Sequence, residues 1–198
     1  MQYSLYVHLA LALAIFLLAK ISVLPDIIKI FFLWYWLDMD SQANSLLAVM
    51  RTRTLPEPQI LDLYSKLKGD IKHRAVPENA ISPVFELIRL ALDAPNYLDA
   101  GLSMLSHLIK RLQGQHQDSL LDSQAQRLIP ILVDRLASAK EGHRSRTRQA
   151  LVALCSVSST VFMMTVNLLA DVTFRSDNPR AKEEAMQWIL SVSYQVRF

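Results

Sequence analysis

The 198-residue chain has a single cysteine, Cys155, and only four glycines. One cysteine can form neither an internal disulfide nor a CxxC-type zinc or redox motif. No two glycines are adjacent, and neither the dinucleotide-binding fingerprint nor the P-loop pattern occurs. The five histidines are scattered, without an HExxH motif or paired Cys/His spacing. The sequence therefore predicts no metal site and no bound cofactor.

The chain also carries little surplus charge. Its 21 lysines and arginines against 18 aspartates and glutamates leave a formal net charge of +3. A surplus of this size does not argue for nucleic acid as a partner. The charges within residues 1–38 cancel, so the positive surplus belongs to the remainder of the chain.

No catalytic constellation is recognisable. The serines and threonine in 156–160 follow Cys155 closely, but no histidine is placed to act as their base, so this segment is predicted to link and cap helices. The carboxylates are spread along the chain, as expected for solvated charges on helix faces. His107 has apolar neighbours and is expected to lie in or beside the core. These features indicate a protein that is not an enzyme.

Residues 1–38 contain two hydrophobic runs, 9–19 and 30–37. Neither run reaches the ~20 residues of a membrane-spanning helix, and joining them places charged residues and Pro25 within the span. A secretory signal fits badly because no basic segment precedes the first run. Three interpretations remain: a membrane anchor or uncleaved signal, a buried element of the fold, or an artefact of a translation start that lies at Met39. We favour the third.

From Met39 onward the apolar residues recur at helical spacing, and no segment shows sustained alternation with a period of two. One apolar stripe runs along residues 60–71, and Pro77 opens a helix whose stripe includes Phe85. The later helices are predicted over about 98–112, 119–137, 144–156, 160–175 and 179–194. The pattern predicts helices only, with Phe85 and Trp188 in the core.

Short breaks divide these helices at 95–96, 138–143 and 176–179. Comparable breaks recur about every 38–46 residues, which is the range of HEAT-type helix pairs. Because each pair has an apolar face that it cannot bury alone, neighbouring pairs should stack, with the turns inside the pairs along one edge. We predict an all-α HEAT-repeat α-solenoid of about four helix pairs over residues 39–198.

Basic residues lie at successive turns of this predicted solenoid. Lys140 and Arg144 flank one turn, and Arg180 and Lys182 follow the next. Cations near helix N-termini are disfavoured by the helix dipole, which makes a purely stabilising role less attractive. We therefore predict a basic ridge that binds an acidic protein surface. The alternative is that they are ordinary solvated residues at helix starts.

Four stretches carry a resemblance to a known family: residues 67–92, 100–112, 128–144 and 176–190. In this order and without large gaps, they resemble the N-terminal TOG domain of fungal CLASP proteins, which stabilise microtubules and the mitotic spindle. The segment NPRAKEEAMQW, within the last stretch, is the most specific part. The likeness is expected to end at Leu190.

The resemblance implies a partial TOG domain over residues 39–198, in which paired helices form a paddle and the turns inside the pairs face tubulin. Matched position by position, the partner-binding residues it implies are Pro95, Asn96, Tyr97, Lys140, Arg144, Asn178, Arg180 and Lys182. The first turn, residues 53–57, has no aromatic where tubulin-binding TOG domains usually carry one. Kinetochore proteins are therefore the alternative partners, and the expected location is the cytoplasm, the cytoskeleton and the mitotic spindle.

Both ends of the sequence carry further expectations. If residues 1–38 are a genuine anchor, the chain is instead a membrane-tethered HEAT-repeat scaffold, and a membrane is a partner only in that case. The resemblance implies a TOG domain of six repeats, whereas residues 39–198 supply about four. The ending Gln-Val-Arg-Phe also fits a transcript that runs into an unremoved intron.

Overall fold

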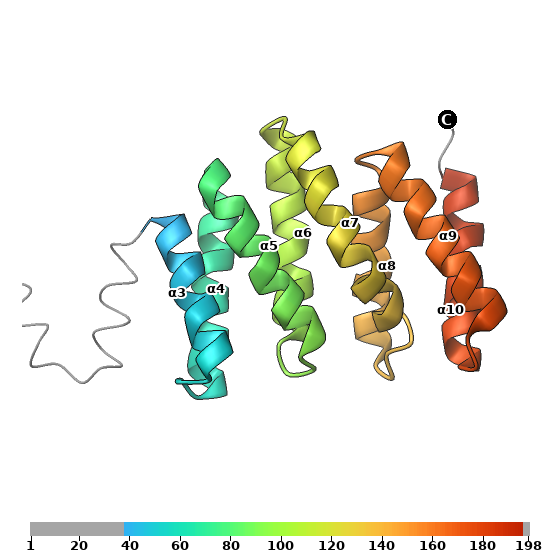
Figure 1. The fold of residues 1–198 in the computed structure, drawn as a ribbon, viewed down its shortest axis with the longest axis horizontal. Coiled ribbons are helices and arrows are strands. Elements are labelled where there is room, and N and C mark those ends of the chain that lie inside the picture. Colours follow the sequence, from blue (N-terminus) through green and yellow to red (C-terminus); the bar gives the residue numbers. More distant parts are fainter. Residues whose placement is uncertain (1–37, 196–198) are drawn as a thin grey trace, which may run out of the picture. The chain divides into compact units, whose positions relative to one another are not determined.

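The computed structural model describes residues 38–195, with side chains described as far as Val192. This part of the chain contains eight α-helices and no strand (Figure 1). The helices are α3 (Met39–Thr52), α4 (Glu57–His73), α5 (Glu78–Asp93), α6 (Leu98–Gly114), α7 (Asp118–Arg135), α8 (Glu141–Cys155), α9 (Ser159–Arg175) and α10 (Pro179–Gln195).

Consecutive helices form four antiparallel pairs that stack in two layers (Figure 1). In the first layer α3 packs on α5, α5 on α7 and α7 on α9. In the second layer α4 packs on α6 and α6 on α8, while α10 lies behind α9. Stacked pairs of this kind form a HEAT-type solenoid, so the predicted fold class is confirmed.

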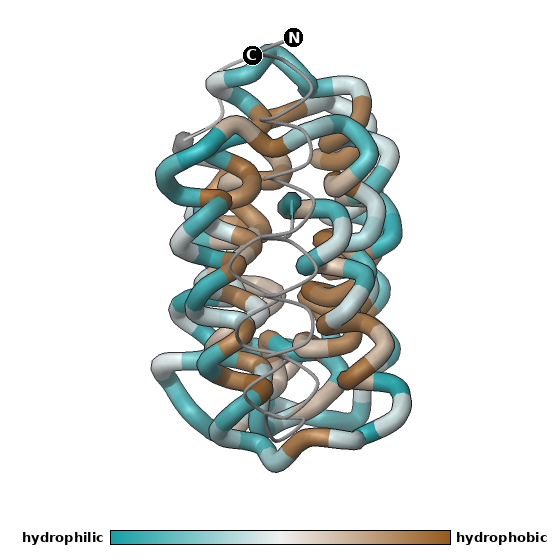
Figure 2. The backbone as a smooth tube through the Cα atoms, turned by 90° about the vertical axis from the view of Figure 1, so that its left-hand side faces the viewer, coloured by the Kyte–Doolittle hydropathy of each residue, from teal (hydrophilic) through white to brown (hydrophobic). Residues whose placement is uncertain are grey.

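The apolar stripes of the helices face one another between the two layers (Figure 2). Leu67 of α4, Ile88 of α5 and Leu105 of α6 are fully buried there. Complete burial of such a side chain contributes about 1.5–3 kcal/mol. Phe85 and Trp188 are 3% and 1% exposed, which confirms the prediction that both belong to the core.

Two helices of the second pair approach closely at a glycine. A Cβ atom added to Gly101 of α6 would lie 2.8 Å from the Cβ of Ala91 in α5 and 3.5 Å from the carbonyl oxygen of Ile88. Real Cβ atoms essentially never come so close, so a side chain here would force the helices apart. The absence of a side chain at Gly101 therefore sets the spacing within this pair.

The helix boundaries agree with the sequence prediction except near α8. This helix begins at Glu141 rather than at about residue 144, and Lys140 is its N-cap. At the next turn Ser158 caps α9, as the sequence predicts for this linker, because its Oγ accepts a hydrogen bond from the Val161 amide at 3.2 Å. The earlier start of α8 places Arg144 within the first turn of this helix.

None of the helices α3–α10 is both long and apolar enough to span a membrane. The competing interpretations of residues 1–38 and the expectation about the ending rest on residues 1–37 and 196–198, which lie outside the described residues.

Candidate partner-binding edge

The turns inside the four helix pairs lie along one edge of the solenoid, at the bottom of Figure 1. They comprise residues 53–56, 94–97, 136–140 and 176–178. The turns between successive pairs lie along the opposite edge. We call the first set the turn edge. The structure places every partner-binding residue predicted from the sequence in or immediately beside it.

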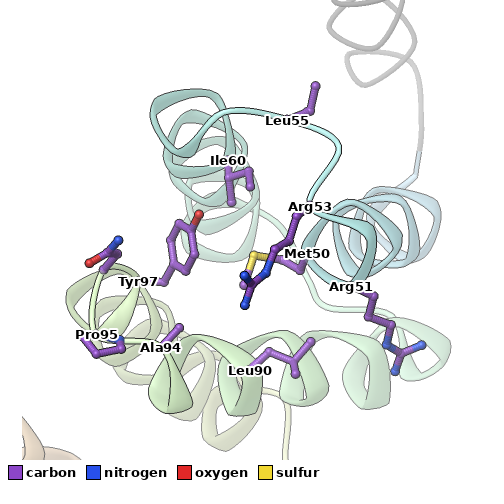
Figure 3. Close-up of a pocket in the computed structure, with 10 residues that line it drawn as sticks. Met50, Arg51, Arg53, Leu55, Ile60, Leu90, Ala94, Pro95 and Tyr97 are labelled. Carbon is purple, nitrogen blue, oxygen red and sulfur yellow. The ribbon is translucent and has the colours of Figure 1, made fainter.

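A cleft of about 490 Å³ opens between the first and second turns (Figure 3). Arg53 and Met50 point into this cleft opposite Tyr97, whereas Arg51 and Leu55 point away from it. Arg53 adopts a φ of 52°, in the left-handed region that few non-glycine residues occupy. The first turn is therefore sharply bent and presents an arginine rather than an aromatic side chain.

Tyr97 supplies the aromatic ring of this cleft. Its ring stacks on Tyr64, with centroids 6.2 Å apart and planes inclined by 19°. Partial burial, and then the negative charge of Glu57, raise the pKa of Tyr97, against the opposing effect of Arg53. Because the ring is half-buried and stacked, Tyr97 forms a wall of the cleft instead of protruding from it.

The second turn forms a ridge between two hollows. Pro95 and Asn96 line the first cleft and also a second hollow of about 430 Å³, which Lys140 and Asp134 border on the other side. The Asn96 Nδ2 donates to Glu57 Oε2 at 2.8 Å, which ties the second turn to the start of α4. A partner surface that fits this edge would thus meet alternating ridges and hollows.

Arg144 does not belong to the exposed surface that the sequence analysis predicts. Its Nε donates to Glu184 Oε1 at 2.9 Å, and its Nη1 donates to the carbonyl oxygens of Ser138 at 2.8 Å and Ala139 at 3.0 Å. Its Nη2 contacts the carboxylate of Glu141. With its side chain only 14% exposed, Arg144 closes the third turn and links it to α10.

The side chain of Asn178 also has a local structural role. Its Oδ1 accepts hydrogen bonds from the backbone amides of Arg180 at 3.1 Å and Ala181 at 3.3 Å. This is the geometry of an N-cap, which satisfies amides that have no partner within the helix. Asn178 therefore starts α10.

Three predicted basic residues present charge to solvent. Lys140 and Arg180 are exposed and Lys182 is half-buried. Among the ion pairs of residues 38–195, none involves these three side chains. Exposed acidic residues, Asp134 and Asp177, alternate with them. The positive charges of the turn edge are thus interspersed with negative ones.

A polar cluster beneath the third turn was not predicted from the sequence. The Nε2 of buried His143 lies 3.2 Å from Asp99 Oδ2, and its Nδ1 lies 3.4 Å from Ser138 Oγ. Arg146 pairs with the same aspartate. The cluster joins α8 to the start of α6, so it fixes the second and third turns relative to each other.

Sequence separation is the signal that would have found these contacts. Asn96 and Glu57 are 39 residues apart, Arg144 and Glu184 are 40 apart, and His143 and Asp99 are 44 apart. These separations match the repeat length, because stacked pairs place equivalent positions one layer apart. Polar residues one repeat apart therefore identify the bonds between pairs.

The described residues offer no metal centre: between residues 38 and 195, no group of three or more His, Cys, Asp or Glu side chains could hold an ion. Cys155 is buried, its Sγ 3.4 Å from Thr165 Oγ1, and burial raises the pKa of its thiol. Stacked helix pairs with aligned turns and polar bonds between repeats define a HEAT-repeat protein.

Comparison with known sequences narrows this class to one family. The family described as "CLASP N terminal" matches residues 61–197, and the chain belongs to this family. The match continues beyond Leu190, which corrects the expectation that the likeness ends there. No solved structure matches the chain.

Similar proteins come from several fungi. The chain is 36% identical over 159 residues to Protein STU1 of Phaeosphaeria nodorum, covering 79% of this chain and 13% of that protein. It is 35% identical over 157 residues to Protein STU1 of Coccidioides immitis, covering 78% and 12%. The matched segment thus spans about an eighth of the length of these relatives.

Proposed function

We propose that residues 39–198 form a partial, non-enzymatic TOG-like domain of a CLASP-type protein, and that its turn edge binds tubulin or microtubules. The observation that carries the proposal is the alignment of four turns on one edge, where Lys140 and Arg180 are exposed and form no ion pair within residues 38–195. Membership of the CLASP N-terminal family supports it. The corresponding location is the cytoplasm, the cytoskeleton and the mitotic spindle.

Binding at this edge depends on rigid shape and on charge. Arg144 and Asn178 hold the third and fourth turns in place, so little conformational freedom is lost when a partner docks. Lys140, Arg180 and Lys182 attract an acidic surface at long range and speed its encounter with the edge. Because these groups are solvated, salt screens the attraction, and the affinity should fall as ionic strength rises.

Kinetochore proteins are the second candidate partners, and one observation favours them. The first turn has no aromatic residue, and the ring of Tyr97 in the second turn stacks on Tyr64 instead of protruding. An edge that binds tubulin through an exposed aromatic would lack that contact here. In this case the same ridges and hollows would receive a different protein surface.

Co-sedimentation of the 198-residue chain with microtubules tests the proposal. We expect the chain to pellet with microtubules at low salt and the double variant Lys140→Glu/Arg180→Glu to stay in the supernatant. The matched control is Lys66→Glu/Arg127→Glu, which changes net charge equally at exposed residues away from the turn edge. This control should pellet as the parent chain does.

Each outcome is decisive. Unchanged pelleting of the Lys140→Glu/Arg180→Glu variant would refute the turn edge as the binding surface. Failure of the parent chain to pellet or to bind free tubulin would refute tubulin as the partner. The same variant pair, assayed against purified kinetochore proteins, then tests the second candidate.

A further inference from the structure

Another hollow, distinct from the two beside the second turn, lies in the layer of α4 and α6, away from the turn edge. It measures about 300 Å³ and is lined by Ile71, Lys72, His107, Lys110 and Arg111. These residues belong to the C-terminal halves of α4 and α6, whereas the turn edge adjoins the N-termini of both helices. We call this feature the basic hollow. A ligand bound there would not occupy the turn edge.

The basic hollow has positive charge without matching negative charge. The charged groups that act on His107 are Lys68, Lys72 and His73 from α4 and Lys110 from its own helix, and none of them is a carboxylate. Within residues 38–195, Lys68, Lys72 and Lys110 take part in none of the ion pairs. Mutual repulsion between these groups falls when an anion binds.

Arg111 lines the hollow and directs one side of its guanidinium at the backbone of α4. Its Nε donates to the carbonyl oxygen of Ile71 at 3.1 Å, and its Nη2 contacts the carbonyl oxygen of Lys72. Arg111 therefore satisfies carbonyl groups at the C-terminal end of α4 and holds Lys72 in place. The exposed cations of the hollow, Lys72 and Lys110, are ammonium groups on two different helices and act as separate point charges.

We propose that the basic hollow binds an acidic peptide segment, a run of aspartate or glutamate residues, through Lys72 and Lys110. Several carboxylates along one extended segment match several separated ammonium groups better than one compact anion does. The alkyl stems of the two exposed lysines provide apolar surface for the peptide. This site is additional to the turn edge and does not require tubulin.

His107 makes the binding depend on pH. Burial, and then the positive charges of Lys68, Lys72, Lys110 and His73, lower the pKa of His107. An acidic peptide offsets those charges, so its binding raises this pKa and is accompanied by proton uptake. The peptide should therefore bind more tightly near pH 6 than near pH 8, and the variant His107→Gln should weaken this dependence.

Fluorescence anisotropy of a labelled oligoglutamate peptide, titrated with the 198-residue chain at low salt, tests the proposal. We expect saturable binding that weakens at least about tenfold in Lys72→Glu/Lys110→Glu and less in Lys72→Gln/Lys110→Gln, because neutralisation removes attraction without adding repulsion. The control is Lys66→Glu/Arg127→Glu, which carries the same charge change at exposed residues outside the basic hollow and should bind the peptide normally. Circular dichroism confirms that each variant is folded.

Three results would overturn the proposal: no binding of oligoglutamate, equal loss in the two charge-reversed variants, or stronger competition by inorganic phosphate than by unlabelled oligoglutamate. Equal loss would mean that net charge, not the hollow, governs binding. The peptide assay contains no microtubules, so its failure and the failure of the turn-edge proposal are separate results.

Discussion

Arg144 of α8 and Glu184 of α10 form an ion pair that joins the third and fourth helix pairs. The Arg144 Nε lies 2.9 Å from Glu184 Oε1, and the two side chains are only 14% and 9% exposed. Arg148 contacts the same glutamate and also pairs with Glu141 at 2.7 Å. Two arginines and two glutamates thus fasten the fourth pair to the third. Sequence analysis assigns Arg144 to partner binding, but in the structure its side chain forms an ion pair within the fold.

Replacement of Arg144 should lower stability more than replacement of its exposed neighbour Lys140. Arg144→Ala leaves the buried carboxylate of Glu184 with one cation fewer and removes the hydrogen bonds to Ser138 and Ala139, so we expect a loss of about 3 kcal/mol. Arg144→Lys should recover only part, because an ammonium group cannot reach all these acceptors. Lys140→Ala should stay within about 0.5 kcal/mol of the parent chain.

Urea denaturation of these variants measures the difference. Equal free energies of unfolding for Arg144→Ala and Lys140→Ala would show that the ion pair with Glu184 contributes nothing net to stability.

Two glycines in helices should respond in opposite ways to the same change. Gly101→Ala puts a Cβ 2.8 Å from that of Ala91 and should destabilise the chain by about 1–3 kcal/mol. Gly69→Ala meets no atom within 4 Å and should stabilise α4 by about 0.5–1 kcal/mol, because alanine is the better helix former. Thermal melting decides the point. A lower melting temperature for both variants would contradict the open surroundings of Gly69.

Tyr64 should make the fold sensitive to alkali. Its hydroxyl donates to the buried carbonyl oxygen of Leu87 at 2.9 Å, and burial, with the smaller effect of Tyr97, raises the pKa of Tyr64 well above its ordinary value. A raised pKa in the folded state means that this contribution is fully present below the unfolded value of about 10 and is lost as the pH rises above it. Stability should therefore fall between pH 9 and pH 11.

The matched variant for this prediction is Tyr64→Phe, which should cost about 1 kcal/mol at neutral pH through the lost hydrogen bond. It should also lose less stability than the parent chain between pH 9 and pH 11, as measured by urea midpoints. If both proteins lose the same amount, ionisation of Tyr64 is not the source of the sensitivity.

The helices and their layers could be predicted because they depend on local, periodic information. Apolar residues at helical spacing identify the buried faces of α4 and α5, and Pro77 and Ser158 indicate where helices begin. The repeat of turns about every 38–46 residues then places equivalent positions side by side. The two-layer solenoid follows from these two periodicities.

The orientation of individual charged side chains could not be predicted in this way. Because α8 starts at Glu141, Arg144 lies within its first turn, where successive side chains are separated by about 100° around the helix axis. Its partner Glu184 is 40 residues away, so no local pattern reveals the pair. The basic hollow was missed for the same reason, because Lys72 and Lys110 come together only when α4 and α6 stack.

Hydrogen–deuterium exchange of the 198-residue chain, with and without tubulin, tests the central proposal that the turn edge is the binding surface. The account predicts slower amide exchange on tubulin binding at the turns 94–97, 136–140 and 176–178, with little change at the turns between pairs on the opposite edge. Protection confined to the opposite edge, or no protection at saturating tubulin, would contradict it.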